Sequence, residues 1–137
     1  MELAMAILSA VAAVAAAATA IVTFFNGKRM EYGNAELQIR TMISEANYHL
    51  CEAKAKYADK PQSETLDKVF KALNEDIMNV YDEACAKYND KKVDRERFKK
   101  MYVYEIRQLV EAFPEKYGVT TKYAATLRVY QEWQPKG

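Results

Sequence analysis

The sequence predicts an all-α protein with one N-terminal transmembrane helix, followed by a small cytosolic bundle of about four helices built on a long antiparallel helical hairpin. Three observations predict this fold class. Only seven of the 137 residues are Gly or Pro, a long N-terminal stretch carries no charge, and two later segments repeat apolar residues with heptad spacing. We expect a transmembrane anchor at 1–26, a juxtamembrane connector at 27–34 and a cytosolic helical domain at 35–134.

The uncharged stretch Leu3–Phe25 is long enough to cross a bilayer. Its 23 residues would form a helix of roughly 34 Å, against a hydrocarbon core of about 30 Å. A secretory signal is the alternative, because Ala18-Thr19-Ala20 could serve as a cleavage site. However, no Lys or Arg precedes the stretch, and the apolar run continues beyond that site to Phe25. We therefore expect an anchor that is retained.

Basic residues stand on only one side of this stretch. Lys28 and Arg29 follow it directly, and the bias of basic residues toward the cytoplasm predicts a single-pass protein of the inner (cytoplasmic) membrane. The N-terminus would lie outside and the C-terminal domain in the cytoplasm. In that reducing compartment, Cys51 and Cys85 are expected to be free thiols.

Two heptad seams follow the anchor. Gly27 and Gly33 bracket the expected connector, and Asn34 is the expected N-cap of the next helix. Spacings of four and three residues then predict two helices separated by a loop at Pro61, with seams at Ile39, Ile43, Ala46, Leu50, Ala53 and Tyr57, and at Leu66, Phe70, Leu73, Ile77, Val80 and Ala84. The seams would meet in an antiparallel hairpin, although the same pattern also suits a coiled coil between chains.

Two shorter helices are expected after a turn at 89–92. Asp94 is a candidate N-cap, and Pro114 ends the third helix. A last helix is expected to begin at Thr120 or Thr121 and to carry Tyr123, Tyr130 and Trp133.

No residue pattern points to catalysis. The sequence lacks nucleotide-binding, nucleophile-elbow and zinc-protease motifs, and its lone histidine, His49, has no partners at metal-ligand spacing. We expect no enzyme, no cofactor and no metal, although a catalytic site of unrecognised type stays as a third hypothesis. A net charge of +1 gives no reason to expect nucleic acid as a partner.

Two sets of residues are candidates for surface contacts. Basic residues gather after the apolar stretch and in the segment 87–100, and the candidates for contact with the membrane surface are Lys28, Arg29, Lys91, Lys92 and Arg95. The alternative for that segment is a solvated turn with alternating charges. Tyr123, Tyr130 and Trp133 are the candidate surface for a protein partner, whereas most other tyrosines are expected at the margin of the core.

The segment YDEACAKYNDKKVDRERFKKMYVYEIRQLVEAF and the later YAATLRVYQEW carry a resemblance. They resemble the C-terminal part of small uncharacterised bacterial single-pass membrane proteins with a short helical cytosolic domain, over roughly residues 64–134. The resemblance implies the fold and the location. It implies no activity and no functional residue.

These observations predict a membrane-tethered helical module that binds or scaffolds an unknown protein partner. The alternative is a small oligomeric membrane-active protein, holin-like or of a defence type, whose Ala-rich span self-associates. Small residues at four-residue spacing, Ala6, Ala10 and Ala18 among them, would permit such homo-oligomers.

Overall fold

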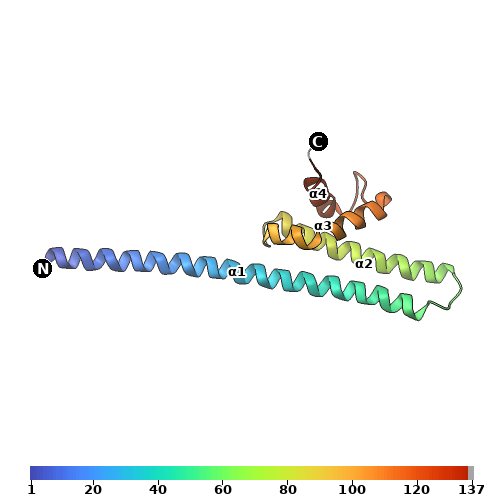
Figure 1. Cartoon of the computed structure of the whole chain (residues 1–137), viewed down its shortest axis with the longest axis horizontal. Coiled ribbons are helices and arrows are strands. Elements are labelled where there is room, and N and C mark those ends of the chain that lie inside the picture. The colour runs from blue at the N-terminus through green and yellow to red at the C-terminus, as the bar shows by residue number, and fades with distance from the viewer. Residues whose placement is uncertain (136–137) are drawn as a thin grey trace.

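The computed structural model describes residues 1–135, and these residues form helices and turns without any strand. The elements in chain order are α1 (Glu2–Lys56), α2 (Glu64–Asn89), α3 (Arg95–Ala112), the short 3₁₀ turn η1 (Pro114–Lys116) and α4 (Ala124–Glu132). Figure 1 shows that the first half of α1 projects alone, while the other helices gather around its second half. The all-helical fold class predicted from the sequence is confirmed for these residues.

The helix α1 runs without a break through 27–34, the segment where a connector was expected. Asn34 therefore lies inside the helix and is not an N-cap, so that prediction was wrong. Neither Gly27 nor Gly33 has a positive φ. A glycine inside a helix costs only about 0.5–1 kcal/mol, and no proline interrupts the segment, so the turns on either side carry the helix across both glycines.

The second half of α1 and the helix α2 form an antiparallel hairpin. Ser63 caps α2 by accepting a hydrogen bond from the Leu66 N–H (3.2 Å), as expected for a helix that follows a Pro-containing loop. Side chains also join the two helices: the Lys87 ammonium group donates to Gln38 Oε1 at 2.6 Å. The end of α2 therefore lies beside the middle of α1.

The predicted seams meet in this hairpin, but unevenly. Ile39, Ile43 and Ala46 of α1 are buried, as are Ile77, Ala84 and Tyr88 of α2. Toward the loop, the seam residues are only half-buried, namely Leu50, Ala53, Tyr57, Leu66, Phe70 and Leu73. Most of them lie outside the main core cluster, in which α3 and α4 supply a third layer over the hairpin.

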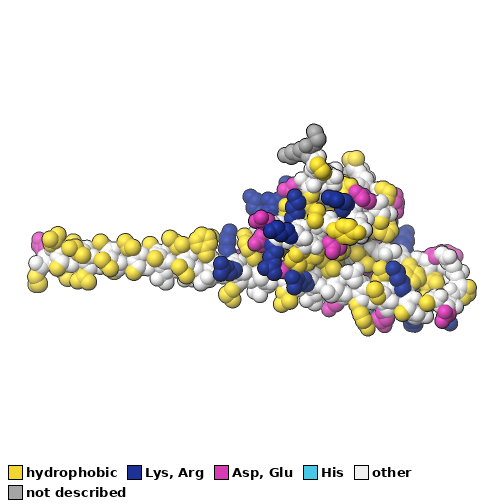
Figure 2. Space-filling view, in the orientation of Figure 1, with side chains coloured by type: hydrophobic (Ala, Val, Ile, Leu, Met, Phe, Trp, Pro, Cys, Tyr) yellow, Lys and Arg dark blue, Asp and Glu magenta, His cyan; other side chains and the backbone are white. Residues whose placement is uncertain are grey.

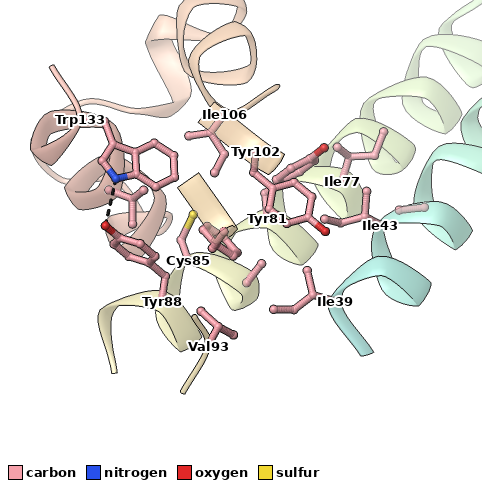
Figure 3. Close-up of a cluster of buried hydrophobic side chains, with 14 residues drawn as sticks. Ile39, Ile43, Ile77, Tyr81, Cys85, Tyr88, Val93, Tyr102, Ile106 and Trp133 are labelled. Atoms are coloured by element: carbon pink, nitrogen blue, oxygen red, sulfur yellow. Dashed lines mark hydrogen bonds between the residues drawn. The ribbon is translucent and has the colours of Figure 1, made fainter. Parts of the chain in front are cut away.

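An aromatic cluster joins α2, α3 and α4 in the main core. Trp133 packs edge-on against Tyr88, with ring centroids 5.3 Å apart, and its indole N–H donates to the Tyr88 hydroxyl at 3.0 Å (Figure 3). Phe98 and Tyr102 of α3 complete the cluster. Val93, in the turn between α2 and α3, is buried at its edge.

The helix α4 begins three or four residues later than expected and has no local side-chain cap. Asp82 of α2 fills this role, since its carboxylate accepts hydrogen bonds from the backbone N–H (2.9 Å) and the hydroxyl (3.0 Å) of Thr126. Thr121, expected near the helix start, instead accepts from the Tyr123 N–H in the preceding loop.

Candidate membrane interface

The N-terminal part of α1 is an exposed apolar rod. Every residue from Met1 to Glu31 is exposed, and large side chains such as Leu3, Val14 and Phe25 are 75%, 70% and 63% accessible. Figure 2 shows this bare rod of apolar side chains leaving the body of the molecule. Among residues 1–135, α1 is the one helix long and apolar enough to cross a membrane, and none of its most apolar segment is buried.

Basic side chains gather where the rod enters the body, as Figure 2 shows in dark blue. Lys28 and Arg29 lie one turn beyond Phe25 on α1, and the Lys28 ammonium group lies 5.4 Å from the centre of the Phe24 ring. Both basic side chains are exposed. The boundary between apolar and charged residues is therefore sharp.

The turn between α2 and α3 carries Lys91 and Lys92 and lies at the end of the domain nearer the apolar rod (Figure 1). The turn is a Schellman motif, in which the Lys92 N–H donates to the Lys87 carbonyl and the Lys91 N–H to the Tyr88 carbonyl. Lys91 occupies its left-handed position with a φ of 58° and is the one non-glycine residue with positive φ in the described chain. We call Lys28, Arg29, Lys91 and Lys92 the basic collar.

Arg95 has a different environment from these four residues, although the sequence grouped it with them. Its guanidinium pairs with the Glu132 carboxylate at 2.9 Å and stacks over the Tyr88 ring at 4.3 Å. Arg95 thus ties the start of α3 to the end of α4, and its charge is already partnered.

An open groove of about 450 Å³ lies between α1 and the start of α3, beside the basic collar. Two acidic groups in the groove are engaged: Glu36 pairs with Arg40 (3.3 Å) and with Arg97 (3.1 Å), and Asp94 caps α3 by accepting from the Arg97 N–H. The residues that line this α1–α3 groove are Arg29, Tyr32, Gly33, Glu36, Leu37, Arg40, Asp94 and Arg97.

Sequence reasoning missed Arg40 and Arg97 as parts of one site. The Glu36–Arg40 spacing is visible in the sequence as an i,i+4 pair. The approach of Arg97 depends on how α3 lies against α1, which no local pattern encodes.

The expected C-terminal partner surface is corrected by the structure. Tyr123 and Trp133 are buried, at 2% and 9% exposure, so their side chains form part of the interior. Tyr130 is half-buried and donates from its hydroxyl to Glu111 at 3.3 Å. The difference arises because α4 packs against α2, where the Trp133 indole donates to the Tyr88 hydroxyl inside the core. An amphipathic ring suits a small core as well as an interface, so the residue type alone does not separate the two.

The remaining polar residues offer little for chemistry. No group of three or more His, Cys, Asp or Glu side chains within residues 1–135 is placed to hold a metal ion. His49 is exposed, with Glu52 at 4.0 Å. Both cysteines are free thiols, as expected, and burial raises the pKa of the Cys85 thiol to about 12, which keeps it protonated.

In comparisons with known proteins, no protein-family model, no curated protein and no solved structure matches the chain.

Proposed function

We propose that the protein is a membrane-tethered helical module that holds an interaction domain close to the inner face of the cytoplasmic membrane and has no catalytic site. The observation that carries this proposal is the exposed, uncharged segment Leu3–Phe25, which continues without a break into a folded helical domain. A protein in water rarely exposes an apolar surface of this extent.

Energetics support insertion of this segment. Nine of its residues are Leu, Ile, Val or Phe, and each contributes about −0.3 to −0.6 kcal/mol when central, or on the order of −3 to −5 kcal/mol together. No helix of the described chain covers these side chains, so the bilayer is the apolar environment that would accept them.

The continuity of α1 favours an anchor over a cleaved signal. A cut after Ala20 would fall inside an unbroken helix and would leave Ile21, Val22, Phe24 and Phe25 exposed on the product. Lys28 and Arg29 then favour the orientation in which the domain stays in the cytoplasm.

The far end of the hairpin supports the interaction role. Its half-buried seam residues border an open, mainly apolar groove of about 320 Å³ whose lining includes Tyr57, Pro61, Leu66 and Val69. This hairpin-end groove lies at the end of the domain that faces away from the apolar rod (Figure 1). An unpartnered groove on a rigid hairpin suits capture of an apolar helix or peptide.

Localisation and topology test the tether. The full chain should stay in the membrane fraction after alkaline carbonate extraction, and its domain should resist a protease added to the outside of intact spheroplasts. A mature N-terminus near residue 21, or digestion of the domain from outside, would overturn the proposal.

Site-specific crosslinking tests the interaction role. A photo-crosslinking residue at Thr65, on the rim of the hairpin-end groove, should yield one discrete heteromeric product in membranes, whereas one at Lys99 on α3 should not. Both positions are exposed, so labelling efficiency is matched. Equal products from both positions, or none from Thr65, would contradict the role of this groove.

A second candidate function rests on the uncovered span. The small-residue line through Ala6, Ala10 and Ala18 is exposed, so close packing along it would have to come from other copies of the chain. A self-associating span that depolarises cells would fit the membrane-active alternative. This alternative requires that the full chain, but not a chain starting at Gly27, dissipates the membrane potential of expressing cells.

A further inference from the structure

We propose that the α1–α3 groove binds the phosphate of an anionic lipid headgroup from the leaflet that faces the domain. This inference rests on the proposed function, because it requires Leu3–Phe25 to lie in the bilayer. It adds a ligand class and a binding site to the tether.

The position of the groove along α1 suits a headgroup. Arg29 lies four residues beyond Phe25, or roughly 6 Å along the helix axis, and each headgroup layer is about 5–8 Å thick. The far part of the groove, at Arg40, lies roughly 22 Å beyond Phe25. The groove therefore begins at Arg29 within the headgroup layer, and its remaining part extends above that layer.

The α1–α3 groove and Lys28 lie on adjoining faces of α1, with Tyr32 common to both. Steps of three and four residues carry the hairpin seam back from Ile39 through Ala35 and Tyr32 to Lys28. The start of α3 lies against this part of α1, since Arg97 pairs with Glu36. Basic groups from both segments thus converge on one side of the helix where it would leave the bilayer.

The charges of the groove leave donors free for an anion. Three arginines, Arg29, Arg40 and Arg97, face two carboxylates, and both carboxylates are engaged. Arg29 makes no ion pair within the described residues, and Arg97 uses one terminal nitrogen for Glu36. Because a guanidinium carries five N–H donors in a planar fork, these two side chains retain the geometry that binds a phosphate through paired hydrogen bonds.

Helix direction turns these side chains toward the apolar rod. Helical side chains incline toward the N-terminus of their own helix. The contacts Glu36–Arg97 and Arg40–Met101 advance together, so α3 runs parallel to α1, and both helices begin on the side of the rod. Arg40 and Arg97 therefore lean toward the layer where lipid phosphates lie.

Lys91 supplies an independent indication. The left-handed position of a Schellman motif normally holds glycine, yet here it holds an exposed lysine at a φ of 58°. A cation held at a conformationally unfavourable position, three residues before the groove residue Asp94, supports a role in attracting anionic headgroups.

Lipid retention by the full chain tests the site. The chain is reconstituted in nanodiscs of phosphatidylcholine with phosphatidylglycerol as the minor component, and the lipids it retains on release are counted by native mass spectrometry. Phosphatidylglycerol should be enriched about tenfold over its share in the disc. Arg29→Gln and Arg97→Gln should each remove most of this enrichment, while Lys54→Gln, an equal charge change at the far end of α1, should preserve it.

Three results would overturn the proposal. The first is a chain that inserts but shows no preference for phosphatidylglycerol. The second is an equal loss in Lys54→Gln, which would show a dependence on total charge alone. The third is a loss of enrichment when inorganic phosphate is added, which would identify a soluble anion as the ligand. A chain that fails to enter the discs contradicts the proposed function as well, so the two failures are distinguishable.

Discussion

Asp82 is a cap supplied from outside the helix that it caps. The first turn of α4 has no local side-chain acceptor, and the Asp82 carboxylate accepts from both the N–H and the hydroxyl of Thr126. We expect Asp82→Ala to lower the free energy of unfolding by about 1–2 kcal/mol, the usual cost of losing an N-cap. Thermal unfolding measures the effect, and Asp76→Ala, an exposed change on the same helix, should be near neutral. Equal effects of the two changes would contradict the capping role.

Lys91 holds its turn at a conformational cost that glycine would avoid. A residue with a side chain costs about 1–2 kcal/mol in the left-handed region, and glycine avoids this cost. Glycine also raises the entropy of the unfolded chain, which offsets part of the gain. Lys91→Gly should therefore stabilise the domain by about 0.5–1 kcal/mol, seen as a higher Tm. Lys92→Gly is the matched control and should destabilise, since Lys92 has no positive φ. The turn geometry would be contradicted if Lys91→Gly lowered the Tm.

Buried phenol and thiol groups predict a loss of stability at alkaline pH. Burial raises the pKa of Tyr81 from 10.0 and of Cys85 from 9.0, each to about 12, and raises the pKa of Tyr117. Between about pH 9 and about pH 12, the unfolded chain releases protons that the folded chain keeps. The free energy of unfolding is therefore fully maintained below about pH 9 and falls as pH rises through this window.

A series of melting curves from about pH 8 to about pH 11 checks this expectation. Cys85→Ala is the informative variant, because it removes the group that titrates first in the unfolded chain and should delay the onset of the decline. A Tm that stays constant across the series would show that these groups are not buried as described.

The hairpin seam is the element on which the domain depends. Ile77 is 8% exposed and packs in the main core, so an unpaired aspartate there would cost several kcal/mol, comparable with the ~5–15 kcal/mol stability of a whole domain. We expect Ile77→Asp to unfold the domain, as judged by circular dichroism. Asn79→Asp introduces the same group at an exposed position of α2 and should leave the Tm nearly unchanged. A wild-type Tm for Ile77→Asp would contradict the placement of Ile77 in the buried seam of the hairpin.

Local signals predicted most helix boundaries. Asp94 was identifiable as the cap of α3 and Pro114 as its end, because each acts through its own backbone or its nearest turn. Gly27 and Gly33 led to the wrong prediction of a connector at 27–34, because glycine destabilises a helix but does not prevent one. Whether a helix continues through such residues depends on the turns on either side.

Tertiary placement was the part that the sequence left open. Nothing local distinguishes a Trp133 that fills a core from one that faces a partner, since both environments reward a large ring. The cap from Asp82 and the approach of Arg97 to Glu36 cross long stretches of sequence, so neither was predicted. The exposed boundary at Lys28 and Arg29, by contrast, was predictable, because it depends only on the order of residues after the apolar run.

At the scale of the whole molecule, the rod and the domain are independent in their packing. No buried residue lies before Ile39, so the segment before Gly27 contributes nothing to the core. A chain that starts at Gly27 should therefore be soluble and should unfold within ~2 °C of the domain in the full chain, measured in the same detergent. A drop of about 8 °C or more, equal to 1–2 kcal/mol, would show that the rod does support the domain.

Because α1 is continuous from Glu2 to Lys56, it connects the apolar rod to the domain as one rigid helix. A flexible linker would let the domain swivel freely, whereas a continuous helix fixes the rotation of the domain relative to the apolar rod. Each residue inserted between Phe25 and Glu31 would rotate the domain by about 100° about the axis of α1. One extra alanine would therefore move the groove to another side of the apolar rod, and seven would return it to within about 20° of its original direction. Any rotation or tilt of the apolar rod would then be passed along α1 to the hairpin at the opposite end.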